Sequence, residues 1–241
     1  MNLTAVDVLF ISAHPDDTEL SAGGTVAKFV KDGKRVGMLE LTSGEMGTRG
    51  DAKTRKRESA NAAKALGVAF REQLDFGDGN LQTGREQELE IIDVLRRTRP
   101  RLVFAPWPDE RHPDHARTGR IVTEASFYAG LRALDTGVAA HRPQAVIYYL
   151  QNYMVTPSFV VDVTKTWKIK EKSIAAYRSQ FFDPKSKEPQ TFISRPDFLN
   201  MIEARGRHFG ALIGVEFGEA FVTKQPPKID DPIAAYGGRE V

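Results

Sequence analysis

The sequence contains no cysteine in its 241 residues. This absence excludes a disulfide scaffold, a zinc site built from thiolates and a catalytic cysteine. An excess of charge of one sign is also lacking, because 34 basic residues face 32 acidic ones and leave a net charge of +2. A balance this close to neutral lacks the basic footprint of a nucleic-acid-binding protein.

Long apolar runs are missing too. No stretch approaches the roughly 18 consecutive apolar residues that indicate a membrane-spanning helix. The first ten residues have no basic start, and no small-residue cleavage site follows them. We therefore expect a cytoplasmic protein that has neither a membrane nor a nucleic acid as its partner.

The composition that remains is that of a globular protein. Apolar residues make up 41% of the chain and charged residues 27%, which is ordinary for a folded domain. A chain of 241 residues is most simply one domain. We expect a single domain over 1–241, in which 225–241, rich in proline, glycine and charge, form a surface tail.

Strand-like and helix-like patterns alternate along the first half of the chain. The expected strands are 5–12, 36–41, 70–76, 102–107, 146–150 and 159–163. The expected helices are a stripe from Thr25 that ends at Gly33, then 55–66, a stripe through Leu89, Ile92 and Leu95, and 117–128, 166–179 and 198–209. This alternation predicts a Rossmann-like α/β fold, with a mostly parallel sheet of order 3-2-1-4 plus later strands and with helices on its faces.

Two short motifs carry three of the five histidines beside aspartates. They are His14-Pro15-Asp16-Asp17 and His112-Pro113-Asp114-His115. The first motif follows the first predicted strand, and the second follows the fourth. In a sheet of order 3-2-1-4 these two strands are neighbours at the switch point, where ligands bind beyond the carboxyl ends. The predicted fold therefore brings the two motifs together.

The residue types in these motifs suit a metal. A catalytic zinc site has three protein ligands from imidazole and carboxylate groups and keeps one open position. Two histidines and one aspartate would complete that set, and a spare histidine and a spare aspartate would remain for proton transfer. The same donors also suit Fe²⁺, Co²⁺ or Mn²⁺.

Turn chemistry offers a simpler explanation for each motif taken alone. Asp17 could cap the next helix, and Pro113-Asp114 could start the helix that follows. A third segment, the glycine-rich loop 42–50, lacks the phosphate-binding P-loop pattern, and the first strand-to-helix turn lacks Gly-x-Gly-x-x-Gly. We therefore expect neither a nicotinamide nor a flavin enzyme.

At these residues the sequence resembles the PIG-L/LmbE family of zinc-dependent N-acetylglucosamine deacetylases. The matching pieces are 13–17, the loop 44–50, Arg55 with Glu58, and 112–115. The later stretches 177–180 and 209–219 resemble the bacillithiol-biosynthesis branch, whose enzymes remove acetyl from N-acetylglucosaminyl-malate. Phe217 departs from the tyrosine of many relatives, which concerns the subfamily and not the chemistry.

The resemblance implies a role for each residue of the motifs. The zinc ligands would be His14, Asp17 and His115. Asp16 would be the general base. His112 would stabilise the tetrahedral oxyanion as an imidazolium, and Asp114 would hydrogen-bond to it and fix its tautomer.

The resemblance also implies contacts with a small amino-sugar substrate. Arg55 would bind the substrate, and Glu45 would be the polar contact of the loop that lines the sugar pocket. Malate brings two carboxylates, which predicts a fork of guanidinium groups at the rim. Arg55, Arg111 and Arg178 are unranked candidates for it. Relatives suggest a homo-oligomer, either a trimer or a hexamer.

Three other functions stay open at this point. The first is a deacetylase of another amino-sugar conjugate, such as chitooligosaccharides. The second is a non-catalytic sugar-binding protein on the same fold, which would bind without turnover. The third is a metal-dependent phosphoesterase, which would favour more carboxylate ligands and a second metal.

Overall fold

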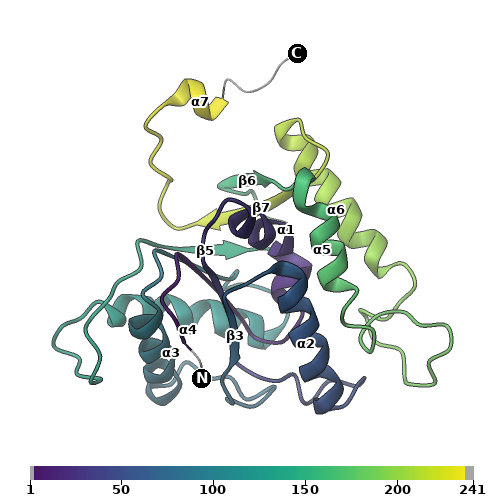
Figure 1. Ribbon diagram of the computed structural model, residues 1–241, viewed down its shortest axis with the longest axis horizontal. Coiled ribbons are helices and arrows are strands. Elements are labelled where there is room, and N and C mark those ends of the chain that lie inside the picture. The colour runs from purple at the N-terminus through teal and green to yellow at the C-terminus, as the bar shows by residue number, and fades with distance from the viewer. Residues whose placement is uncertain (1–2, 237–241) are drawn as a thin grey trace.

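A central seven-stranded sheet with helices on both faces makes up the body of the molecule (Figure 1). The structure is a computed structural model that describes residues 3–236. The strands are β1 (Val8–Ser12), β2 (Val36–Glu40), β3 (Phe70–Gln73), β4 (Leu102–Pro106), β5 (Ala145–Tyr149), β6 (Phe159–Asp162) and β7 (Gly218–Thr223). The helices are α1 (Asp17–Lys31), α2 (Ala52–Leu66), α3 (Arg85–Thr98), α4 (Pro113–Ala129), the 3₁₀ turn η1 (Thr164–Thr166), α5 (Trp167–Ile174), α6 (Phe198–Ile213) and α7 (Pro232–Tyr236).

The strand order is β3-β2-β1-β4-β5-β7-β6. The first five strands are parallel, so the predicted order 3-2-1-4 is confirmed. Strand β7 lies antiparallel between β5 and β6. Within residues 3–236 no helix has both the length and the apolar character that crossing a membrane requires.

The parallel strands are buried on both faces, which explains their continuous apolar runs. Successive side chains of a strand point to opposite faces of the sheet. Leu9 and Ile11 of β1 therefore join the core under α3 and α4, whereas Val8 and Phe10 join the core under α1 and α2. A third cluster, centred on Trp167 stacked against Phe217, packs α5 against α6.

Two elements differ from the sequence prediction. The helix expected over 166–179 ends at Ile174, because the chain then turns and the Tyr177 hydroxyl reaches Glu19 on α1. Strand β7 was not predicted at all, because the buried carboxylate of Glu219 interrupts its apolar pattern. The expected surface tail agrees with the exposure of residues 225–236, and its last residues, 237–241, lie outside the described part of the chain.

Glu219 has a specific place in the fold. Helix α1 is kinked at Ala22, whose φ of −135° is not helical. The kink frees the backbone N–H groups of Gly24 and Thr25, and both donate to the Glu219 carboxylate, at 3.0 and 2.7 Å. The same carboxylate forms a buried ion pair with Lys170 of α5. One side chain of β7 thus joins α1 to α5.

We predict that Glu219→Ala lowers the free energy of unfolding by about 3–5 kcal/mol, because it leaves the Lys170 ammonium buried without its partner. The exposed Glu216 is the matched control, and Glu216→Ala should stay within about 0.5 kcal/mol of wild type. Urea denaturation followed by circular dichroism measures both variants. Equal stability of the two variants would show that the buried pair does not hold the helices together.

Candidate functional site

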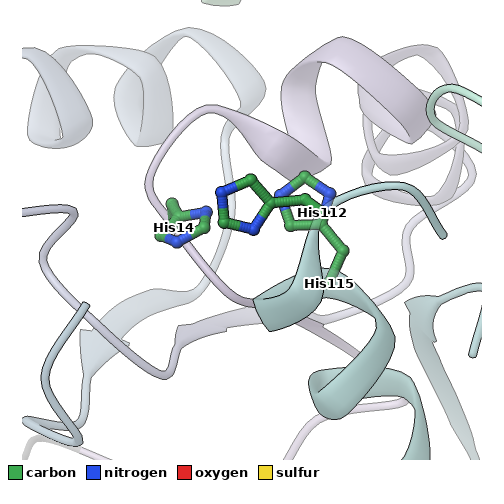
Figure 2. A group of neighbouring side chains, drawn as sticks. All are labelled: His14, His112 and His115. Carbon is green, nitrogen blue, oxygen red and sulfur yellow. The ribbon is translucent and has the colours of Figure 1, made fainter. Parts of the chain in front are cut away.

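The two histidine motifs lie together at the carboxyl edge of the sheet. Figure 2 shows His112 and His115 at the start of α4, facing His14 from the loop after β1. The ring centroid of His14 lies 5.0 Å from that of His112 and 5.3 Å from that of His115. One ring nitrogen from each histidine lies within 4.8 Å of the others. The pairing of β1 with β4 therefore creates the convergence that the strand order predicts.

The first turns of two helices define the positions of these side chains. Helix α4 begins at Pro113, and His112 is its N-cap, with the ring Nδ1 accepting the backbone N–H of Asp114 at 3.2 Å. Helix α1 begins at Asp17, and Asp16 is its N-cap in a left-handed conformation, with φ of 95°. Both helix N-termini face the site, and their partial positive charge favours anionic groups there.

Asp17 is the carboxylate at the centre of the site. Its Oδ2 accepts the backbone N–H of His14 at 2.9 Å, and its Oδ1 accepts Nε2 of Gln151 at 2.9 Å. The same Oδ1 lies 3.1 Å from Nε2 of His115, and Oδ2 lies 3.5 Å from Nδ1 of His14. Burial opposes ionisation, but His115 and His14 hold the pKa of Asp17 well below its usual range. Asp17 is thus an anion between two imidazoles and does not act as the helix cap.

The donor set fits a divalent metal. Two imidazoles and one ionised carboxylate, with no thiolate, are the ligands of a catalytic zinc site. Nε2 of His14 lies 3.0 Å from Oδ1 of Asp78, and Nδ1 faces the Asp17 carboxylate. An outer carboxylate of this kind commonly orients a metal-binding histidine. The described residues also offer an overlapping set, His14, Asp78 and Asp114, whose ligand atoms lie within 4.8 Å of one another.

Asp16 is buried next to this set. Its carboxylate lies 3.8 Å from a guanidinium nitrogen of Arg55. Burial raises the pKa of Asp16 to about 7, although the positive charge of Arg55 opposes the rise. A carboxyl group with this pKa both takes and releases a proton near neutral pH.

His112 and Asp114 are arranged differently from the sequence-based expectation. The Asp114 carboxylate accepts the backbone N–H of Gly79 at 2.8 Å and lies 3.5 Å from Nε2 of His14, so it does not serve as the partner of the His112 ring. Burial, together with the charges of His115 and His14, lowers the pKa of His112. Because Nδ1 accepts a backbone N–H, Nε2 is the ring nitrogen that is left to donate. The imidazolium role expected for His112 during the reaction stays a prediction.

A cavity of about 880 Å³ opens above the histidines. Its floor is polar and its walls are apolar, and the wall includes five large hydrophobic side chains that are exposed: Met46, Tyr153, Met154, Phe192 and Met201. Arg111 lines the same cavity, with its guanidinium 4.9 Å from the ring centroid of Phe192. The volume lies in the upper part of the range of roughly 300–1,000 Å³ that is usual for small-molecule sites.

The expected substrate contacts are only partly free for a ligand. Arg55 lines the cavity, but it donates to the backbone oxygens of Gly44 at 2.7 Å and of Pro15 at 3.1 Å. Glu45 accepts hydrogen bonds from Oγ of Ser43 and from the backbone N–H of Asp78, so it holds a loop in this structure, and its sugar contact stays a prediction.

Of the three arginines considered for a carboxylate fork, only Arg111 remains at the rim with a free guanidinium. Arg55 is committed to backbone oxygens, and Arg178 lines a separate cavity of about 530 Å³ beside α2 and α5. Arg55 and Arg111 line the cavity and Arg178 does not, and the carboxylate fork itself stays a prediction.

Sequence reasoning missed Asp78, Gln151, Glu110 and Arg205. Asp78 follows β3, between two glycines, and Gln151 follows β5. Both lie just past strand ends at the same edge of the sheet as the histidine motifs, so the strand-end rule would have found them if it had been applied to every strand. Arg205 is on α6, far from any motif, and carries no comparable signal.

Buried charges lie under the site. The Arg71 guanidinium lies between Glu19 of α1 and Glu40 of β2, and its Nη2 lies 2.9 Å from Oε1 of Glu40. One arginine therefore faces two carboxylates. Burial raises the pKa of Glu40 to about 7, while Arg71 opposes the rise and Glu19 adds to it.

The fold and site together define a doubly wound α/β protein with an imidazole and carboxylate centre at the switch point of its sheet. The family PIG-L, described as GlcNAc-PI de-N-acetylase, matches residues 9–126. The chain is 38% identical over 189 residues to a diacetylchitobiose deacetylase of Thermococcus kodakarensis, which covers 72% of this chain and 70% of that protein. The chain belongs to the PIG-L family.

Solved structures agree with this assignment. A conserved protein from Thermus thermophilus superposes with a TM-score of 0.86 at 37% identity, and the match covers 93% of this chain and 97% of that one. The N,N′-diacetylchitobiose deacetylase of Pyrococcus horikoshii gives a TM-score of 0.79 at 30% identity, with 92% of this chain and 84% of that one covered. These structures share the single-domain fold with its mostly parallel sheet.

The raised pKa of Glu40 predicts a pH dependence of stability. Between its ordinary value of 4.5 and about 7, folded Glu40 keeps a proton that the unfolded chain has released. This contribution to the free energy of unfolding is complete below pH 4.5 and is lost as the pH rises through 7. Glu40→Gln should therefore gain stability relative to wild type between pH 5 and pH 8, measured by urea denaturation. Glu90→Gln, at an exposed position, should show no such gain. If the difference in unfolding free energy between Glu40→Gln and wild type did not change with pH, the raised pKa of Glu40 would be contradicted.

Proposed function

We propose that this protein is a metal-dependent deacetylase that hydrolyses the acetamide of an N-acetylglucosamine conjugate. The observation that carries the proposal is the buried Asp16 next to the group formed by His14, Asp17 and His115, all on the floor of one cavity. Membership of the PIG-L family and likeness to two diacetylchitobiose deacetylases support it.

His14, Asp17 and His115 would hold the metal, which we propose to be Zn²⁺, with Fe²⁺, Co²⁺ and Mn²⁺ as the alternatives that the donors suit. When bound, such a metal supplies Lewis acidity to the substrate carbonyl and lowers the pKa of a water molecule toward about 7.

Asp16 performs the proton transfers. It takes a proton from the attacking water as the oxygen–carbon bond forms at the acetamide carbonyl. It then gives that proton to the nitrogen as the carbon–nitrogen bond breaks, so that acetate and a free amine leave. The raised pKa of Asp16 suits both steps, because a group that titrates near the working pH is an effective base and an effective acid.

His112 stabilises the negative charge that develops on the carbonyl oxygen. Its Nδ1 is occupied by the backbone N–H of Asp114, so Nε2–H is the donor that remains. A fixed donor next to the developing oxyanion lowers the barrier without reorganising during the reaction. Asp114 contributes through its backbone N–H, while its carboxylate holds Gly79 near His14.

For the conjugate itself we propose a neutral amino-sugar partner, as in diacetylchitobiose and related chitooligosaccharides. The mixed apolar and aromatic wall of the cavity suits the C–H face of a sugar ring, and of the three candidates for a carboxylate fork only Arg111 lines the cavity without a hydrogen bond to the backbone. N-acetylglucosaminyl-malate is the second candidate, carried by the resemblance of 177–180 and 209–219 to the bacillithiol branch. Cytoplasmic location and a trimer or hexamer stay predictions from the sequence.

We predict that Asp16→Asn keeps the metal but loses about 10²–10⁴-fold in turnover, because the amide cannot take the proton. His115→Ala should instead lose the metal. Metal content by mass spectrometry and amine release by fluorescamine measure the two effects separately. Asp109→Asn is the control. Asp109 is exposed and lies in the loop between β4 and α4, so this variant should match wild type in metal content and in turnover. Near-native turnover by Asp16→Asn would refute its role as the base.

We predict that zinc-loaded protein releases amine from N,N′-diacetylchitobiose faster than from N-acetylglucosaminyl-malate or free N-acetylglucosamine, and that chelator-stripped protein releases none. Arg111→Met should reduce activity on the malate conjugate more than on the disaccharide. A preference for the malate conjugate in wild type would reverse the choice of partner but keep the reaction. Binding of these sugars without turnover by the zinc-loaded protein would instead support a sugar-binding protein.

A further inference from the structure

Gln151, from the second half of the chain, contacts the Asp17 carboxylate at the centre of the site. It follows β5 directly and lines the cavity. Its side-chain Nε2 donates to Oδ1 of Asp17 at 2.9 Å, while the backbone N–H of His14 donates to Oδ2 at 2.9 Å. Each oxygen of the Asp17 carboxylate thus has an amide donor besides the imidazole next to it, and together the two amide donors restrict its rotation.

Gln151 is itself held from both sides. Its backbone N–H donates to Oε1 of the buried Glu110 at 2.7 Å, and the backbone N–H of Asn152 donates to the same carboxylate at 3.1 Å. Arg205 of α6 donates to the backbone oxygen of Gln151 and to that of Leu20, the latter at 2.6 Å. The turn after β5 is therefore fixed through its main chain, and the side-chain amide of Gln151 is left to donate a hydrogen bond to Asp17.

We propose that Gln151 is a positioning residue that orients the Asp17 carboxylate toward the metal, and that Glu110 acts through it by holding the turn. This inference rests on the proposed function, in which Asp17 is a metal ligand. A carboxylate that binds a metal is commonly held by an outer donor, and loss of such a partner costs about 10–100-fold in metal affinity or activity. The donor to Oδ2 is a backbone group that no substitution removes, so the amide of Gln151 is the part of this arrangement that a variant can test.

The geometry also says what rotation of Asp17 would disturb. Oδ1 is shared between Gln151 and His115, whose Nε2 lies 3.1 Å away. If the amide donor is lost, Oδ1 keeps only its contact with His115, and the carboxylate is less restrained about its own bond. Gln151 therefore restrains the Asp17 oxygen that lies beside the imidazole of His115.

The test compares Gln151→Met with Gln144→Met. Methionine keeps the length and the unbranched shape of glutamine but cannot donate a hydrogen bond. Gln144 is exposed and lies directly before β5, so it is a matched control at the other end of the same strand. Zinc affinity by competition with a chromogenic chelator, melting temperature of the metal-free protein, and kcat and KM on diacetylchitobiose are measured for both variants and for wild type.

We expect Gln151→Met to bind zinc about 10–100-fold more weakly than wild type, with an unchanged melting temperature of the metal-free protein. At saturating zinc its KM should stay near wild type, because a positioning residue acts on the metal ligand and not on the sugar. Gln151→Asn, which keeps an amide but is one methylene too short to reach Oδ1 of Asp17, should weaken zinc binding in the same direction, and it provides the test if the methionine variant does not fold.

A double-mutant cycle tests the part assigned to Glu110. Glu110→Gln should weaken zinc binding, and Glu110→Gln combined with Gln151→Met should be no weaker than Gln151→Met alone, because both changes act on one contact. Additive losses would overturn the assignment of Glu110.

The outcomes separate this inference from the function on which it rests. Zinc affinity of Gln151→Met equal to that of wild type would overturn the inference and leave the proposed function standing. A loss of stability in the metal-free variant with unchanged zinc affinity would reduce Gln151 to a structural residue and overturn it as well. A wild-type protein that neither binds zinc nor releases amine would overturn the proposed function, and the inference with it.

Discussion

The site depends on one ionised carboxylate, that of Asp17. It is the first residue of α1, and it meets the loop after β1 through His14, helix α4 through His115 and the end of β5 through Gln151. Burying an anion is costly unless hydrogen bonds and opposite charge compensate it. The chain supplies hydrogen-bond donors and imidazoles to the Asp17 carboxylate. Segments far apart in sequence are therefore held together because they contact the same two carboxylate oxygens.

The sequence predicts well what depends on periodicity and poorly what depends on single long-range contacts. Buried parallel strands leave continuous apolar runs, so the strand order and the meeting of His14 with His115 followed from pattern alone. Strand β7 escaped because its central Glu219 has the polarity of a surface residue, and only its contacts with α1 and Lys170 explain its burial. The orientation of Asp114 toward His14 likewise depends on a loop that local sequence does not define.

Most of the contacts made by the stretches that resemble the bacillithiol branch support the scaffold. Tyr177 bonds Glu19, and Ser179 donates twice to the buried Glu58 of α2. Phe217 stacks on Trp167, with the two ring planes inclined by only 6°. None of these side chains lines the cavity above the histidines. Three of the side chains in these stretches therefore pack the C-terminal half against α1 and α2, whereas Gln180 of the same stretch lines the cavity.

The left-handed backbone of Asp16 limits what can occupy that position for reasons unrelated to proton transfer. Among the described residues other than glycine, only Asp16 and Arg99 have a positive φ. This region of backbone space is accessible to aspartate and asparagine at modest cost and is unfavourable for β-branched and bulky residues. A longer acid such as glutamate would have to pay the backbone cost and also move its carboxyl group. The shape of the main chain at this position therefore favours aspartate independently of the proton transfer that is proposed for it.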